Sequence, residues 1–148
     1  MDETRMHMMD LSRKGYYCSQ ILLLMGLEAQ GKNNPDLIRA VGGLALGGGR
    51  GEGVCGSLTG AACLIALYAA KGRDDEEEHE DLLLMLSELE EWFQAEIGGR
   101  YGGVRCNDIL GNGTPSTERC GPIVAEAYMQ AMSILMEHGL DPTESREV

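Results

Sequence analysis

The sequence predicts an all-α protein, a single-domain bundle of about five to six helices around a central apolar helix. Apolar residues recur at helical spacing in several segments, and none alternates with polar residues for long enough to predict a strand. Aromatic residues make up only 5% of the chain, whereas Met occurs 9 times. The core must therefore be built from Leu, Ile, Met, Val and Ala, a set of residues that favours helices.

The length of 148 residues suits one domain, which we place over residues 1–140, with a flexible tail over residues 141–148. A domain of this size buries roughly 70% of the surface that its unfolded chain exposes. The fold is therefore expected to need neither a disulfide nor a metal.

Apolar spacing and turn residues divide the chain into helical segments. Asn34 is the expected cap and Pro35 the first-turn residue of the third helix. An acidic run over residues 74–78 is expected to open the fifth helix, where negative charge favours the positive end of the helix. The central helix is the segment that is apolar nearly all round. The expected helices cover residues 3–14, 16–31, 35–47, 55–70, 74–97 and 122–139, with a short turn at residues 106–111.

The net charge and the lengths of the apolar runs argue against a nucleic acid partner and against a membrane span. The net charge is −12 and no run of Lys or Arg is present, so a nucleic acid partner is not expected. The longest apolar runs, residues 21–27 and 61–70, are far shorter than the ~20 residues of a membrane span. The start, MDETRMHMMD, lacks the basic and apolar parts of a secretory signal. We expect a cytoplasmic protein.

Five cysteines in such a chain indicate metal binding or catalysis rather than a disulfide scaffold, because cytosolic thiols are kept reduced. Cys18, Cys55, Cys106 and Cys120 each fall at or near the predicted start of a helix or tight turn. Unpaired N–H groups there stabilise a thiolate. Cys63 lies inside the apolar helix and is expected to be inert. The alternative is that the cysteines are simply small buried apolar residues.

Gly51, Gly53 and Gly56 form a G-x-G-x-x-G pattern, but no strand precedes it and no βαβ unit surrounds it. A dinucleotide site is therefore not predicted. We expect the glycine-rich run to let the backbone wrap tightly around Cys55. Gly53, Gly56 and Gly60 are the positions predicted to approach a cofactor, if one binds.

The three histidines, His7, His79 and His138, lie in polar helical settings and are predicted to be surface residues rather than ligands or bases. The chain contains no C-x-x-C pair, so neither a thioredoxin motif nor a zinc ribbon is supported. Any site that the cysteines share must be assembled from distant segments.

Four motifs occur in order along nearly the whole chain. They are GYYCSQILL around Cys18, CGSLTGA from Cys55 after a run of glycines, VRCNDILG around Cys106, and Cys120 itself. In this order and spacing they resemble the C_GCAxxG_C_C family of redox-active proteins, which is defined by four cysteines. The chain departs from the usual family pattern at two positions, with Ser57 in place of Ala and with Tyr17 in place of Asn.

The resemblance implies a helical fold and a redox or metal role for the four cysteines of the motifs, and it leaves Cys63 outside them. The motifs are also similar to the cysteine-bearing part of split-Soret cytochromes, which implies an iron–sulfur cluster. A C-x-x-C-H haem attachment motif does not occur in the chain, so haem is not expected.

Three functions remain open from the sequence. In the first, Cys55 attacks a disulfide or oxidant and a second cysteine resolves the product, with a redox protein or a small oxidant as partner. In the second, Cys18, Cys55, Cys106 and Cys120 hold a [2Fe-2S] cluster or zinc, and no cysteine is free to be a nucleophile. In the third, the chain is a structural helical homo-oligomer and its cysteines are incidental.

Overall fold

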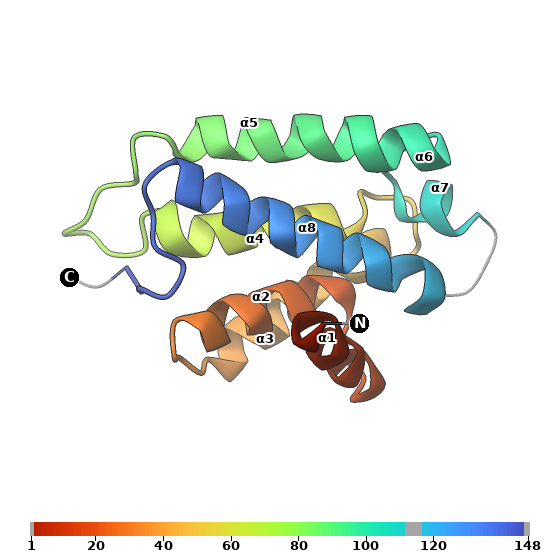
Figure 1. The fold of residues 1–148 in the computed structure, drawn as a ribbon, viewed down its shortest axis with the longest axis horizontal. Helices are drawn as coiled ribbons and strands as arrows, with labels where there is room; N and C mark the ends of the chain where they lie inside the picture. Colours follow the sequence, from red (N-terminus) through yellow and green to blue (C-terminus); the bar gives the residue numbers. More distant parts are fainter. Residues whose placement is uncertain (1, 112–116, 147–148) are drawn as a thin grey trace.

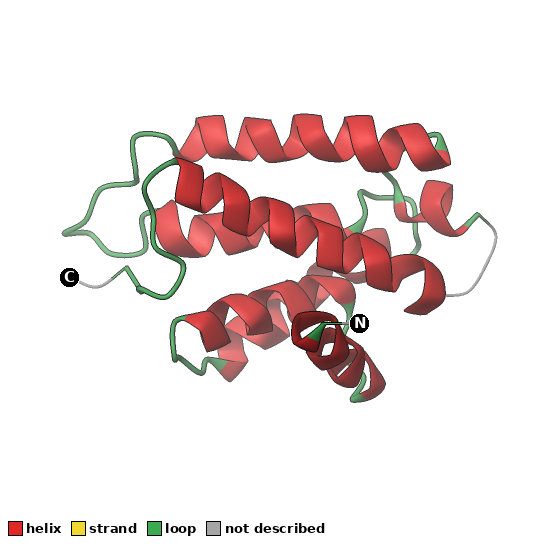
Figure 2. Cartoon of the chain, in the orientation of Figure 1, coloured by secondary structure: helices red, strands yellow, loops and turns green. Residues whose placement is uncertain are grey.

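A computed structural model describes residues 2–111 and 117–146 of the chain, which consist of helices and loops (Figure 1, Figure 2). Over those residues no strand forms, and one isolated antiparallel bridge joins Val54 and Arg105. The all-α prediction is confirmed. The elements follow in the order α1 (Glu3–Arg13), α2 (Cys18–Ala29), α3 (Pro35–Val41), the 3₁₀ helix η1 (Gly42–Gly47), α4 (Gly56–Ala69), α5 (Leu82–Phe93), the π-helical turn η2 (Gln94–Gly98), α6 (Gly99–Tyr101), α7 (Cys106–Leu110) and α8 (Thr117–Glu137).

The central helix is α4, as the sequence predicts. It packs against α2, α5 and α8, and Figure 1 shows it between α5 on one side and α2 on the other, with α8 crossing it. Ala61, Leu64 and Ile65 are fully buried on this helix. Burial of a Leu or Ile side chain contributes about 1.5–3 kcal/mol, so this helix forms the centre of the apolar core.

Two helix starts follow directly from their capping residues. The Asp2 carboxylate accepts a hydrogen bond of 2.8 Å from the backbone N–H of Arg5 at the start of α1. The Asn34 side chain accepts one of 3.2 Å from the N–H of Leu37, with Pro35 in the first turn of α3. Such caps satisfy N–H groups that have no partner within the helix.

The predicted start of the fifth helix is wrong, because α5 begins at Leu82 rather than in the acidic run. Residues 74–81 form a loop. In it the Glu76 carboxylate accepts a hydrogen bond from the N–H of Gly72, and it also forms an ion pair with Arg146, 3.6 Å away. A contact between residues so far apart in sequence cannot be read from local charge.

The last helix also begins earlier than predicted. It starts at Thr117, and Pro122 lies inside it instead of opening it. Proline has no N–H to donate to the carbonyl four residues earlier, that of Glu118, so Pro122 interrupts one hydrogen bond in the second turn of α8. The earlier start puts Cys120 on the first turns of α8 instead of in a preceding loop.

The C-terminal segment lies against the end of α4. The Tyr68 hydroxyl donates a hydrogen bond of 2.7 Å to the carbonyl of Pro142, and Arg146 Nη1 donates one of 3.3 Å to the carbonyl of Ala69. Residues 147–148 of the expected flexible tail lie outside the described part of the chain. No described helix is both long and apolar enough to cross a membrane.

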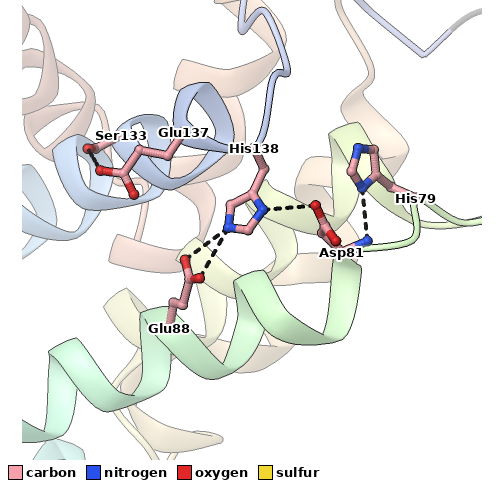
Figure 3. Close-up of polar contacts among 6 residues, drawn as sticks. All are labelled: His79, Asp81, Glu88, Ser133, Glu137 and His138. Carbon is pink, nitrogen blue, oxygen red and sulfur yellow. Dashed lines mark hydrogen bonds and ion pairs between the residues drawn. The ribbon is translucent and has the colours of Figure 1, made fainter.

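His138, just beyond the end of α8, joins α8 to α5 (Figure 3). Its Nδ1 lies 3.0 Å from an Asp81 carboxylate oxygen, and its Nε2 lies 3.1 Å from both carboxylate oxygens of Glu88. These two carboxylates raise the pKa of His138. The His138 side chain is only 14% exposed, so it is a partly buried structural residue rather than the plain surface residue that the sequence predicts.

Candidate functional site

Cys55 and Cys106 are held together by the only β-type pairing among the described residues. The Cys55 N–H donates a hydrogen bond of 2.8 Å to the carbonyl of Val104, and the Cys106 N–H donates one of 3.0 Å to that of Gly53. The two cysteines thus flank the Val54–Arg105 bridge. Cys55 then caps α4, and Cys106 is the first residue of α7.

The close packing of α2 on α4 brings Cys18 to the same place. Cys18 is the first residue of α2, and a Cβ atom at Gly56 would lie 2.6 Å from its sulfur. A Cβ at Gly60, one turn along α4, would lie 2.8 Å from the Cα of Ser19. Side chains at these two positions would separate the helices, so the glycines allow Cys18 to approach Cys55.

Cys120, on the first turns of α8, completes a group of four. All four cysteines line one small cavity of about 30 Å³, here called the inner cavity. The inner cavity is lined by Cys18, Leu46, Cys55, Gly56, Ser57, Cys106, Ile109, Leu110, Cys120 and Ile123. The four cysteines come from segments that are far apart in the sequence, as expected for a site that they share.

Burial keeps two of the four thiols protonated. Desolvation, together with the nearby Cys55 and Cys120, raises the pKa of Cys18 to about 12. Desolvation also raises the pKa of Cys106, again with contributions from Cys55 and Cys120. The expectation that helix starts stabilise thiolates is therefore wrong for Cys18 and Cys106, because loss of water outweighs the helix dipole.

Ser57 is the polar residue of the inner cavity, and its side chain is 1% exposed. Its side chain hydrogen-bonds Cys18, an effect that opposes the raised pKa of that thiol, as does the backbone of Ser19. The backbone N–H of Ser57 donates a hydrogen bond of 3.4 Å to Cys55 Sγ. Where the family usually has Ala, this chain therefore has a side chain, that of Ser57, which can donate a hydrogen bond to the sulfurs.

The glycine-rich loop wraps tightly, as the sequence predicts. A Cβ at either Gly47 or Gly53 would lie 2.5 Å from the carbonyl oxygen of the other residue. Leu46 lies within η1, directly before Gly47, and its φ of 54° is in the left-handed region that leucine rarely adopts. Its carbonyl accepts hydrogen bonds from Gly49 and Gly51, which hold this conformation.

A second and larger hollow opens beside the cysteines. This outer pocket has a volume of about 370 Å³ and lies between α1, the start of α2 and the start of α8. Its lining residues are Arg5, Met8, Met9, Ser12, Tyr16, Tyr17, Cys18, Ile21, Leu46, Glu118, Cys120, Gly121, Pro122, Val124 and Ala125. Three of them, Cys18, Leu46 and Cys120, also line the inner cavity and so separate the two spaces.

The four cysteines are not arranged to ligate one ion. Among the described residues, no group of three or more Cys, His, Asp or Glu side chains could hold a metal ion as placed. No disulfide joins the cysteines either, all of which are described. Cys55 and Cys106 are buried, whereas Cys18 and Cys120 are half-buried.

The other residues singled out by the sequence lie elsewhere. Cys63 is half-buried on α4, does not line the inner cavity, and has its pKa raised by burial. Of the glycines predicted to approach a cofactor, Gly56 lines the inner cavity, whereas Gly53 and Gly60 pack against other backbone segments. The sequence analysis does not predict the outer pocket. The one signal for it in the sequence is the pair of aromatic residues, Tyr16 and Tyr17, next to Cys18.

The chain is thus a helical bundle in which four cysteines line one cavity. The sequence model of the family described as "Putative redox-active protein (C_GCAxxG_C_C)" matches residues 16–134, which include all four cysteines. The chain therefore belongs to this family, and the resemblance is confirmed. No curated protein and no solved structure matches it.

Proposed function

We propose that the protein is a thiol–disulfide oxidoreductase in which Cys18 and Cys120 exchange electrons with a substrate. The observation that supports this most is that all four cysteines line the inner cavity, while these two also line the outer pocket. A substrate in the outer pocket therefore meets Cys18 and Cys120. Cys55 and Cys106 are buried and do not line that pocket.

The reaction takes two exchange steps. Cys120 loses its proton to water and attacks one sulfur of a substrate disulfide, the S–S bond breaks, and one substrate thiol leaves with a proton. Cys18 then attacks the Cys120 sulfur of the mixed disulfide, its proton passes to the departing substrate sulfur, and the second substrate thiol is released. The protein dithiol loses two electrons and two protons, and the substrate disulfide gains both.

We assign the first attack to Cys120 because the thiolate is the nucleophile and the Cys18 thiol is held protonated by a pKa of about 12. The sequence alone favours Cys55 for this role. Cys55 caps α4 and its sulfur accepts the N–H of Ser57, but its side chain is only 7% exposed. Cys55 and Cys106 then form a second dithiol that can exchange with the first through the shared inner cavity.

A trapping experiment tests this assignment. Reduced protein is treated with a small disulfide, and mass spectrometry then locates the adduct in the Cys18→Ser, Cys120→Ser and Cys63→Ser variants. A mixed disulfide on Cys120 should persist longer in Cys18→Ser than in Cys63→Ser, since its resolving thiol is absent. Cys63→Ser is the matched control and should behave as the unsubstituted protein. An adduct that accumulates on Cys55 instead would overturn the assignment.

A second candidate function is metal binding by the four cysteines, which one observation favours. Cys55 and Cys120 help to raise the pKa of Cys18 and of Cys106, and a cation among the sulfurs would reverse that effect. Four cysteines suit zinc or a [2Fe-2S] cluster as ligands. A cavity of about 30 Å³ admits a single ion but not a cluster, and the side chains must draw together to ligate even one ion.

Purification without oxygen from cells supplied with iron and zinc separates the two candidates. Bound metal that is lost in Cys55→Ser, with broad visible absorption in the case of iron, would establish ligation and exclude thiol exchange for that form. Metal-free protein whose thiols pair reversibly would support the oxidoreductase.

A further inference from the structure

The outer pocket has the dimensions and lining of a small-molecule site. Its volume of about 370 Å³ falls in the usual range for such sites. Most of its wall is apolar and comes from three elements, with Met8 and Met9 on α1, Ile21 on α2, and Val124 and Ala125 on α8. A molecule bound there would exchange water for apolar and aromatic contacts.

The polar groups of the pocket favour a neutral occupant. Arg5 and Glu118 contribute one charge of each sign, so the lining carries no net charge. The chain as a whole carries a net charge of −12, which repels anions at longer range. A neutral molecule meets neither this repulsion nor the cost of burying a charge against apolar walls.

Aromatic rings stand at the edge of the pocket that adjoins the cysteines. Tyr16 and Tyr17 line the pocket, are 36% and 48% exposed, and directly precede Cys18. Flat apolar rings of a ligand could pack on such side chains. A ligand held there would have a reactive bond within reach of Cys18 and Cys120, which form the wall toward the inner cavity.

We infer that the outer pocket binds a neutral, apolar organic disulfide and presents its S–S bond to Cys120. This inference rests on the proposed function and names the substrate class of the same site. The apolar groups on the two sulfurs occupy the space between α1 and α8, and the exchange then proceeds by the two steps given above. The disulfide leaves as two neutral thiols, and Cys18 and Cys120 become joined.

The test compares two aromatic disulfides that release coloured products, the neutral dipyridyl disulfide and the dianionic dithiobis(nitrobenzoate). Both are reacted with reduced Cys63→Ser protein, and each rate is divided by the rate with a simple free thiol. We expect the neutral reagent to react faster after this correction, and its rate to saturate with concentration because binding precedes reaction.

Two substitutions on α1 provide a matched pair. Met9 lines the pocket, whereas Met6 does not line it and is 58% exposed. Met9→Trp should fill the pocket and lower the rate with dipyridyl disulfide about tenfold, as expected for loss of one buried apolar group. Met6→Trp should stay within about twofold of the unsubstituted protein. If Met9→Trp does not fold, Tyr17→Ala removes a rim ring at an exposed position and should lower the same rate about fivefold.

The outcomes separate this inference from the proposed function. A rate that is linear in concentration and unaffected by Met9→Trp and Tyr17→Ala, with a Cys18–Cys120 disulfide still formed, would overturn the pocket inference alone. Failure of both reagents to produce that disulfide would overturn the proposed function. Saturation, preference for the neutral reagent and sensitivity to Met9→Trp together would support both.

Discussion

Gly60 sets the distance between α2 and α4, and its replacement by alanine should displace Cys18 from the other cysteines. A Cβ at Gly60 would lie 2.8 Å from the Cα of Ser19 and 3.0 Å from Leu22 Cδ1. Carbon atoms in ordinary contact lie about 3.5–4.0 Å apart, so α2 must move outward by about 0.7 Å or more. Ser19 directly follows Cys18, so the movement reaches the inner cavity.

The size of the effect follows from three terms. Overpacking of a close contact costs about 1–3 kcal/mol. The buried Ser19 hydroxyl donates a hydrogen bond of 2.8 Å to the carbonyl of Val41, and weakening it costs up to about 1 kcal/mol. Alanine inside a helix is favoured over glycine by about 1 kcal/mol, which offsets part of the loss. The expected net loss for Gly60→Ala is therefore about 0–3 kcal/mol.

Gly99→Ala provides the control, because Gly99 is helical with a φ of −64° and a Cβ there would meet nothing within 4 Å. The Gly99→Ala variant gains the helix propensity of alanine without the close contact that a Cβ at Gly60 would make with α2. Urea unfolding of reduced protein, followed by circular dichroism, should show Gly60→Ala to be less stable than Gly99→Ala by at least about 1 kcal/mol. Equal stabilities of the two variants would refute the close approach of α2 and α4 at Gly60.

Three further predictions concern single side chains. Ser57→Ala removes a hydrogen bond that lowers the pKa of Cys18, so alkylation of Cys18 at neutral pH, measured by mass spectrometry, should slow; an unchanged rate would contradict this contact. Leu46→Gly should speed alkylation of Cys55 from the outer pocket, because Leu46 separates the two spaces; no acceleration would argue against that role. His138→Gln should lose about 1 kcal/mol of unfolding free energy at about pH 6 and much less at about pH 9. Because the pKa of His138 is raised in the folded protein, its stabilising contribution is complete below the unfolded pKa of 6.5 and is lost as pH rises through the folded pKa. A loss of unfolding free energy that does not depend on pH, measured by urea titration, would contradict this prediction.

The parts of the fold that sequence predicts are those fixed by local chemistry. The apolar segment at residues 55–70 identifies α4, and Asn34 with Pro35 identifies the start of α3. The positions of Cys18, Cys55 and Cys106 at helix starts follow from the same local cues.

The parts that it misses depend on contacts between distant residues. Glu76 binds Arg146, so the acidic run lies in a loop instead of opening α5. The raised pKa of Cys18 arises from burial by α4 and α8 and from neighbouring sulfurs, none of which local sequence reveals. The outer pocket forms where α1, the start of α2 and the start of α8 come together, and local sequence does not reveal that placement.

In the proposed reaction Cys18 and Cys120 form the dithiol that meets the substrate. The most direct test of this assignment is peptide mapping by mass spectrometry of unsubstituted, metal-free protein that has been oxidised with one equivalent of a small neutral disulfide. We expect an intramolecular Cys18–Cys120 disulfide as the first product, with Cys63 still reduced. A first product that joins two chains, involves Cys63, or leaves all thiols unpaired would contradict it.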